Sequence, residues 1–192
     1  MRFKLLLVTI PFFCSLYGQE KKVTYSAFAI DSKEVVWVQV YHAHQPSGQL
    51  TDRVYDLLKR KSWIKNLHFD GPELVGDIQN FRVDYKRYGG KFLNTSNLIR
   101  TGRWSGKMRV SFKDGKYRVI VYGLEYDGRQ PAMHAGKMSN QPHSIHGTFT
   151  DWVLNSYRTH FKKSRHNNMD IIHFNLKEGF TLKETELIDE DW

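Results

Sequence analysis

The strongest constraint on how this chain can fold is a pair of alternating segments joined by Asp114-Gly115. In residues 107–113 apolar side chains alternate with polar or charged ones, and residues 116–126 (KYRVIVYGLEY) are rich in β-branched and aromatic residues. A period of two indicates strands with one buried and one exposed face. Asp-Gly between two such segments is typical of a tight hairpin turn, which needs positive φ angles. The sequence therefore predicts an antiparallel hairpin over 107–126.

Two more strands and two helices are expected around this hairpin. Residues 34–41 (EVVWVQVY) have the composition of a strand, and residues 74–88 alternate with a period of two. Residues 50–66 are predicted to form a helix because their apolar side chains recur on one face. Thr150 can cap a second helix. Its expected stripe consists of Val153, Tyr157, His160, Phe161 and Ser164. Residues 169–177 can form a short helix or a strand, and we favour the helix.

The remaining segments are expected to be irregular. Residues 19–33 read as an N-terminal tether in which residues 23–30 can form a short strand. Residues 91–104 show no clear pattern, and residues 127–149 read as a long loop because they contain several Gly and Pro residues. Loops of this length tend to be functional. We expect a single domain over residues 34–178, followed by an acidic tail over 179–192.

The N-terminus has the pattern of a secretory signal. Arg2 and Lys4 precede an uncharged run, LLLVTIPFFCSLY, and the chain becomes polar again after Gly18. The run is too short to span a bilayer as a helix, which takes about 20 apolar residues. We therefore expect cleavage after Gly18, and an exported protein that is periplasmic, associated with the outer membrane or extracellular in a Gram-negative bacterium. No transmembrane segment is expected in the mature chain.

Cleavage at this position has two chemical consequences. Cys14 is the one cysteine of the chain and leaves with the signal, so the mature protein forms no disulfide and no thiolate. Removing Arg2 and Lys4 from the 29 Lys and Arg leaves 27, against 20 Asp and Glu, which is a net charge of +7. A basic balance suits contact with anionic glycans or lipid head groups, although it also fits an ordinary solvated surface. Export argues against nucleic acid as a partner.

The predicted order of strand, helix, three strands and helix resembles a family of exported bacterial proteins known as a domain of unknown function with a TATA-binding-protein-like (TBP-like) fold. Three stretches carry the resemblance: residues 54–63, residues 74–78 (LVGDI) and above all residues 113–118 (KDGKYR). It covers about residues 35–126. The resemblance implies an α+β fold, with a small antiparallel sheet and helices packed on one face. It implies no mechanism, because function lies in sites rather than in folds.

A histidine pair raises the question of a metal site. His42 and His44 are two residues apart at the end of a predicted strand, so their imidazoles can point to the same side. A third ligand could come from the 127–149 region, from His134, His143 or His146. These spacings match no standard zinc pattern. Solvent-exposed histidines are the simpler reading, and no cofactor is predicted.

Other catalytic patterns are weak. The sequence has no Gly-x-Ser-x-Gly elbow, and no cysteine remains after cleavage. Carboxylate pairs such as Asp77 or Glu125 with a distant partner stay open, because glycosidase carboxylates come from separate segments. Asp84 lies between Arg82 and Lys86 in the sequence and fits an ion pair with them. We therefore expect a protein that is not an enzyme.

The exposed face of the predicted sheet is the candidate ligand-binding surface. Helices that cover the side of Phe81, Met108 and Val110 would leave the opposite side to basic residues. The predicted ligand-binding residues are Trp37, Tyr41, Arg82, Lys86, Arg109, Arg118 and Tyr122. The face of residues 34–41 is ambiguous because both of its sides are apolar. Arginines between aromatic rings can hold anions and stack on sugars. An ordinary wet sheet face is the simpler alternative.

Three function classes follow. The first is a non-enzymatic binding module of the cell envelope that recognises an envelope component or glycan through this face. The second is a structural or assembly protein of the envelope that self-associates into a homo-oligomer through the same face. The third is a metal-dependent hydrolase that uses His42 and His44.

Overall fold

In the computed structural model of the 192-residue chain, the described residues are 22–43, 46–130, 133–134, 137–138 and 143–183. Their elements, in chain order, are β1 (Thr24–Tyr25), β2 (Phe28–Asp31), β3 (Glu34–His42), α1 (Ser47–Lys59), β4 (Ile64–Asp70), β5 (Glu73–Phe81), η1 (Phe92–Asn94), α2 (Asn97–Thr101), β6 (Arg103–Lys113), β7 (Lys116–Gln130), β8 (Met133–His134), β9 (Lys137–Met138), β10 (His143–Thr148), α3 (Phe149–Val153), η2 (Lys163–Arg165) and α4 (His166–Phe180).

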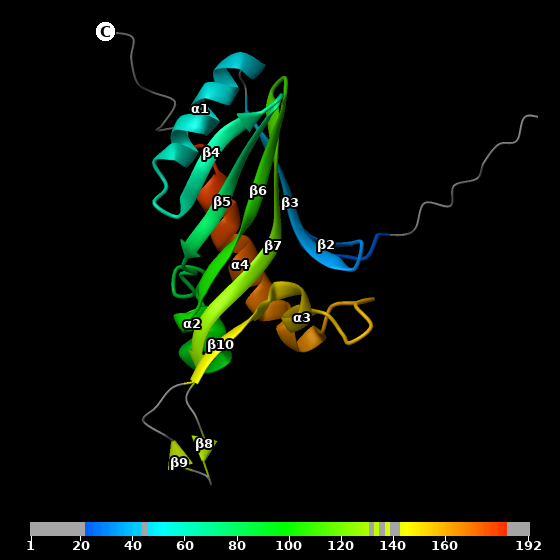
Figure 1. Cartoon of the computed structure of the whole chain (residues 1–192), viewed down its shortest axis with the longest axis vertical. Coiled ribbons are helices and arrows are strands. Elements are labelled where there is room, and N and C mark those ends of the chain that lie inside the picture. Colours follow the sequence, from blue (N-terminus) through cyan, green and yellow to red (C-terminus); the bar gives the residue numbers. More distant parts are fainter. Residues whose placement is uncertain (1–21, 44–45, 131–132, 135–136, 139–142, 184–192) are drawn as a thin grey trace, which may run out of the picture.

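Eight of the described strands form one antiparallel sheet in the order β1-β2-β3-β7-β6-β5-β4, with β10 also paired to β7, and β8 and β9 form a separate two-stranded sheet (Figure 1). The long strand β7 is the centre of this arrangement. Its first half pairs with β3, from Lys116 to Val121, and its second half pairs with β10, from Glu125 to Gln130. Strands β8 and β9 pair with each other beyond this end. The α+β class predicted from the sequence is confirmed.

The predicted hairpin is present, and glycine fixes its geometry. Gly115 has φ 69°, as a tight turn between β6 and β7 requires. Further along β7, Gly123 has φ 59°, and the pairing with β6 shifts between Ser105 and Lys107. This irregularity is a β-bulge, which moves the alternation of β7 by one residue. Leu124 is therefore buried and Glu125 is exposed.

The helices lie on one side of the sheet, as predicted (Figure 1). On α1, Leu50, Val54, Leu57 and Leu58 are buried. Helix α4 contributes Met169, Ile171, Ile172 and Leu176 to the same core. The sheet residues that face them alternate with exposed ones, as Met108 and Val110 do on β6 and Val119 and Val121 on β7. We call the side of the sheet without helices the open face. None of the described helices is long and apolar enough to cross a membrane.

The N-terminal segment belongs to the sheet from residue 24 onward, which agrees with the short strand allowed over 23–30 but not with a tether at these residues. Strand β2 pairs with β3, and the Phe28 side chain is 1% exposed against Phe149 of α3. On β1, the Tyr25 hydroxyl donates to Asp170 of α4 at 2.9 Å. The lower-numbered part of the predicted tether and the cleavage site after Gly18 lie outside the described residues.

The helix predicted over 50–66 is too long at its C-terminal end. Helix α1 ends at Lys59, and residues 64–70 form strand β4, which the sequence analysis missed. Ile64 fits the helical spacing of the preceding apolar residues, but it pairs with Ile78 in the sheet. The strand predicted over 74–88 is likewise shorter, because β5 ends at Phe81. Beyond it, the Asp84 backbone N–H donates to the Asn175 side chain of α4.

The second half of the chain differs most from the prediction. Residues 127–130 continue β7, and residues 143–148 return as β10, so the predicted long loop is largely an extended hairpin. Helix α3 spans Phe149–Val153 with Thr148 as its cap, and the predicted helical stripe does not form. Tyr157, a member of that stripe, is 81% exposed. The helix favoured over 169–177 is confirmed and is longer, from His166 to Phe180.

One contact between the sheet and α4 depends on the protonation of a histidine. The Trp37 indole N–H donates to Nδ1 of His173 at 3.0 Å, so this nitrogen must carry no proton. Burial holds the pKa of His173 below its usual 6.5, the nearby charge of Lys177 lowers this pKa further, and Asp170 opposes both. The folded state thus takes up a proton at lower pH than the unfolded chain does.

We therefore expect the free energy of unfolding to fall as the pH decreases from 6.5 towards the lowered pKa of folded His173, because the unfolded state binds the proton first. Urea denaturation at a series of pH values between about 8 and about 5 measures this dependence. In His173→Asn the change of the free energy of unfolding with pH should be clearly smaller. An equal pH dependence in both proteins would mean that His173 has the same pKa in the folded and the unfolded state.

Candidate functional site

The open face contains only some of the predicted ligand-binding residues. Arg109 on β6 and Arg118 on β7 are exposed there, and Tyr122 is half-buried beside them. Arg109 forms an ion pair with Glu73 of β5, Nε to Oε2, at 3.3 Å. Strand β5 thus places carboxylates among the basic residues of β6, so the open face is of mixed charge.

Trp37 and Tyr41 point to the opposite side, so the prediction that they join the open face is wrong. Trp37 is 0% exposed and lies between His173 and Phe180 of α4. The Tyr41 ring stacks on Tyr117, and its hydroxyl donates to the Lys177 carbonyl at 3.1 Å. Burial raises the pKa of Tyr41 above its ordinary value. Both rings are core residues that tie β3 to α4.

The last two predicted residues, Arg82 and Lys86, lie beyond the end of β5, and the structure separates them. Lys86 is exposed in the turns that follow, whereas Arg82 lines a cavity of 580 Å³. The cavity lies where β5 ends and β6 begins. Its lining is Arg82, Val83, Arg100, Thr101, Gly102, Arg103, Asp127 and Gly128. We call this cavity the arginine pocket.

Arg100 is the arginine of this pocket that the protein positions most firmly. Its guanidinium carbon lies 3.7 Å from the centre of the Phe92 ring, a close cation–π contact. One terminal nitrogen donates to Oδ1 of Asn97 at 3.2 Å, within helix α2. The Nε atom of Arg100 is buried and has no hydrogen-bond partner among the described residues. Leaving a donor unpaired in a buried position is costly, so an acceptor that reached this N–H would relieve that cost.

The pocket carries more positive than negative charge. Arg82, Arg100 and Arg103 come from three different places in the chain, and none has an ion-pair partner within 4.0 Å among the described residues. Asp127, opposite Arg103 in the β6–β7 pairing, is the carboxylate in the lining. The arrangement can therefore hold an anionic group and accept a hydrogen bond from a neutral one.

Sequence reasoning found Arg82 but missed Arg100 and Arg103, because residues 91–104 show no strand or helix period. The signal that could have found them is local. Ser96 accepts a hydrogen bond from the Leu98 N–H as the cap of α2, and Arg100 follows within the next turn. Gly102 and Arg103 then start β6. A capped turn that carries one arginine and ends at a second one is a recognisable basic motif.

A histidine–aspartate pair lies next to the pocket. His146 Nδ1 is 3.5 Å from Oδ1 of Asp127, and the two side chains are 69% and 63% exposed. Such a pair could act as a base with its orienting carboxylate if a nucleophile were held beside it. A second cavity, of 380 Å³, is lined by Ser105 together with Asp127 and His146. No hydrogen bond joins Ser105 to His146 among the described residues. The pair is thus exposed to solvent, and no nucleophile is joined to it by a hydrogen bond among the described residues.

The histidines that were considered as weak candidates for a metal site are not brought together in the part of the chain that the structure describes. His42 ends β3 opposite Lys116. His44 lies outside the described residues, as do the side chains of His134 and His143, whereas His146 faces Asp127. No group of three or more His, Cys, Asp or Glu side chains that could hold a metal ion occurs among the described residues.

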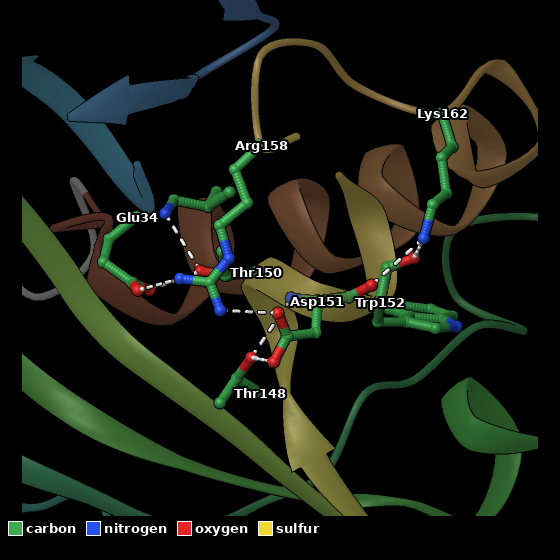
Figure 2. Close-up of polar contacts among 8 residues, drawn as sticks. Glu34, Thr148, Thr150, Asp151, Trp152, Arg158 and Lys162 are labelled. Atoms are coloured by element: carbon green, nitrogen blue, oxygen red, sulfur yellow. Dashed lines mark hydrogen bonds and ion pairs between the residues drawn. The ribbon is translucent and has the colours of Figure 1, made fainter. Parts of the chain in front are cut away.

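A second polar cluster joins β3 to the region after α3 (Figure 2). The Arg158 guanidinium bridges two carboxylates, Glu34 at 2.7 Å and Asp151 at 2.6 Å. The Thr150 hydroxyl donates to Glu34 at 2.8 Å and accepts from the Val35 N–H at 3.0 Å. Every charged group shown there has a partner, so this cluster has a structural role. It holds the segment after α3, which carries Arg158, against β3 of the sheet.

The electrostatics of the cluster agree with that role. Hydrogen bonds from Thr148 and then from Arg158 hold the pKa of Asp151 below its ordinary value. The same contact with Asp151 raises the pKa of Arg158. Lys162 donates to the carbonyl oxygens of Asp151 and Trp152 (Figure 2). The lowered pKa of Asp151 and the raised pKa of Arg158 both favour the charged forms, which fits an ion pair with a structural role.

Comparison with known proteins adds the fold neighbours. No family model matches the sequence, and a search of curated proteins finds no match. Among solved structures, a DUF4468 family protein from Bacteroides ovatus has a TM-score of 0.46 at 12% identity, covering 83% of this chain and 93% of that one. A TBP-like protein from Parabacteroides distasonis has a TM-score of 0.46 at 10% identity, covering 78% of this chain and 90% of that one.

Both neighbours fit the kind of family that the sequence resembles, a bacterial domain of unknown function with a TBP-like fold. At these identities the likeness concerns the fold alone. The arginine pocket is therefore interpreted from its own geometry.

Proposed function

We propose that this protein is an exported, non-enzymatic binding module of the bacterial cell envelope whose arginine pocket binds an anionic group of a glycan. The observation that carries the proposal is the set of three arginines that line one cavity, with the buried Nε of Arg100 unpaired among the described residues. The volume of 580 Å³ falls within the range of about 300 to 1,000 Å³ that small-molecule sites occupy.

The chemistry of the lining supports a charged sugar. A carboxylate, sulfate or phosphate group can accept paired hydrogen bonds from a guanidinium fork, and such bonds are stronger than neutral ones. Asp127 and the Thr101 hydroxyl can in turn bind sugar hydroxyl groups. A ligand with an anionic group and several hydroxyls matches both halves of the lining. A simple inorganic anion would match the arginines alone.

The pocket is a better candidate than the open face that the sequence suggested. On the open face Arg109 is already paired with Glu73, and the rings of Trp37 and Tyr41 are in the core. Arg82, Arg100 and Arg103 all line the arginine pocket, which is a concave surface. A concave site removes more of a ligand from water than a flat one does, which strengthens each ionic hydrogen bond.

Calorimetric titration of the mature protein with oligogalacturonate, an anionic glycan, tests the proposal. We expect Arg100→Ala to weaken binding by about 10- to 100-fold, because one charged hydrogen-bonding group contributes about 1.5 to 3 kcal/mol. Arg100→Lys should recover only part of the loss, since an ammonium group cannot form the paired contacts of the fork. The triple variant of Arg82, Arg100 and Arg103 should show no measurable binding.

The matched control is Arg109→Ala with Arg118→Ala, two arginines of the open face. This variant should bind the glycan as the unchanged protein does. Loss of binding here, with the pocket variant unaffected, would assign the ligand to the open face instead. Sulfate and phosphate are titrated in parallel, and a protein that binds them but no glycan would be a general anion binder. An absence of all binding would refute the proposed function.

The envelope location rests on the N-terminal sequence pattern. Intact mass of the protein recovered from the envelope fraction tests it, and the expected mature chain begins at Gln19. A full-length chain in the cytoplasmic fraction would contradict export without affecting the pocket.

A further inference from the structure

The open-face side chains of β7 change character in order along the strand. They are basic at the hairpin end, apolar in the middle and acidic at the far end: Lys116, Arg118, Ile120, Tyr122, Glu125 and Asp127. The bulge at Gly123 makes this order possible, because without its shift Leu124 would face outward in place of Glu125. The strand therefore presents opposite charges on either side of an apolar centre.

Neighbouring strands widen the apolar centre. Val38 of β3 pairs with Ile120, and Val40 of β3 pairs with Arg118 and is 41% exposed. Val75 of β5 pairs with Arg109, the β6 residue opposite Ile120. We call this surface the apolar strip, and it consists of Val36, Val38, Val40, Val75, Ile120 and Tyr122. The helices that the structure describes lie on the other side of the sheet (Figure 1).

We propose that the open face binds the open face of a second copy of this chain, with the two β7 strands running in opposite directions. A two-fold axis between the sheets and at right angles to β7 places Lys116 and Arg118 of each copy over Glu125 and Asp127 of the other. The same rotation brings the two apolar strips together. An isologous interface requires a surface that is complementary to itself under such a rotation, and this order of charges satisfies that requirement.

The size of the face is sufficient for a stable pair. A strand rises about 3.3 Å per residue and strands lie about 4.8 Å apart, so β7 from 116 to 127 with three neighbouring strands covers about 40 by 20 Å. That footprint of about 800 Å² per copy is the usual size of a specific interface. Two sheets can stack face to face at about 10 Å with their strands nearly aligned.

Strand β6 also places basic residues near the axis, and β5 balances them within each copy. Arg109 is paired with Glu73, and Ser111 donates to the other oxygen of Glu73 at 2.6 Å. Lys107 lies opposite Asp77 in the β5–β6 pairing. The charges of β6 are thus partly neutralised before the copies meet. At the two ends of β7, Lys116, Arg118 and Glu125 have no ion-pair partner within 4.0 Å among the described residues, whereas Asp127 also contacts His146 at 3.5 Å. The charges at these two ends set the direction of docking.

Sedimentation equilibrium of the mature protein at about 1 to 200 µM tests the proposal, because a specific pair of this size is expected to form in or below this range. Val38→Glu should raise the dimer dissociation constant at least about 100-fold, since it places two like charges in a desolvated centre. Phe69→Glu is the matched control. Phe69 is 47% exposed but on the helix side, so this change should leave association unaltered.

Charge reversal distinguishes this docking from any other. Lys116→Glu with Arg118→Glu makes both ends of β7 acidic, and Glu125→Lys with Asp127→Lys makes both ends basic. Each variant alone should be monomeric, whereas an equimolar mixture of the two should form a heterodimer. A monomeric unchanged protein, or a mixture that stays monomeric while the parent dimerises, would overturn the proposal. Arg100→Ala should leave association unchanged, so this result is independent of glycan binding.

Discussion

Trp37→Ala should lower the free energy of unfolding by about 3 to 5 kcal/mol, the usual cost of emptying a buried tryptophan site. The side chain is 0% exposed, it packs against Phe180 and it donates a hydrogen bond to His173. Its loss leaves both a cavity and an unpaired histidine nitrogen under the sheet. Urea denaturation of the variant and the unchanged protein measures the difference.

Two companion variants make this result specific. Trp37→Phe keeps part of the apolar contact but loses the indole N–H, so it should be destabilised by a smaller amount than Trp37→Ala. Leu93→Ala, at a side chain that is 93% exposed and outside the apolar strip, should change stability by less than about 0.5 kcal/mol. A Trp37→Ala protein that is fully stable but no longer binds the glycan would restore Trp37 as a ligand-binding ring and contradict its place in the core.

Phe28→Ala should have an effect of the same size, about 3 to 5 kcal/mol. Phe28 is 1% exposed, and its ring centre lies 5.2 Å from that of Phe149 in α3. The backbone of its strand pairs with β3, so it cannot shift to fill the space that the missing ring leaves. The loss should appear in urea denaturation as an earlier midpoint with an unchanged slope.

Val23→Ala is the matched control for this experiment, because Val23 precedes β1 and is 41% exposed. The variant should be as stable as the unchanged protein. If Phe28→Ala were equally stable, the N-terminal segment would be a tether after all, as its sequence alone suggested. The comparison thus tests whether the sheet begins at β1 or at β3.

The parts of the fold that the sequence predicts are those where local pattern and tertiary contacts agree. The hairpin at Asp114-Gly115 combines alternation with a turn that only a residue tolerant of positive φ can make. For α4 the sequence of residues 169–177 left a helix and a strand open, and the favoured helix is the one that forms. Strand β3 was recognised from its β-branched residues. Each of these signals lies within a dozen residues and needs no distant partner.

The parts that were missed depend on partners far away in the chain. Strand β4 was read as helix because Ile64 happens to continue a helical stripe. The orientation of Trp37 was undetermined because β3 is apolar on both sides, and only the position of α4 decides which side is buried. Strand β10 has little apolar character of its own, and it is a strand because the second half of β7 offers it hydrogen-bond partners. Arg100 and Arg103 join Arg82 only once β5 and β6 are paired.

Because one edge of β7 is shared between β3 and β10, with the Gly123 bulge between them, each half of β7 has its own core neighbours. The first half is held to the end of α4 by the Tyr117 hydroxyl, which donates to the Phe180 carbonyl, whereas Tyr126 in the second half packs on Trp104 and Trp152. The arginine pocket takes Asp127 and Gly128 from the second half and Arg82 from the segment after β5. A bound ligand would connect these two segments, so amide exchange at Asp127 and Gly128 should slow when the pocket is occupied.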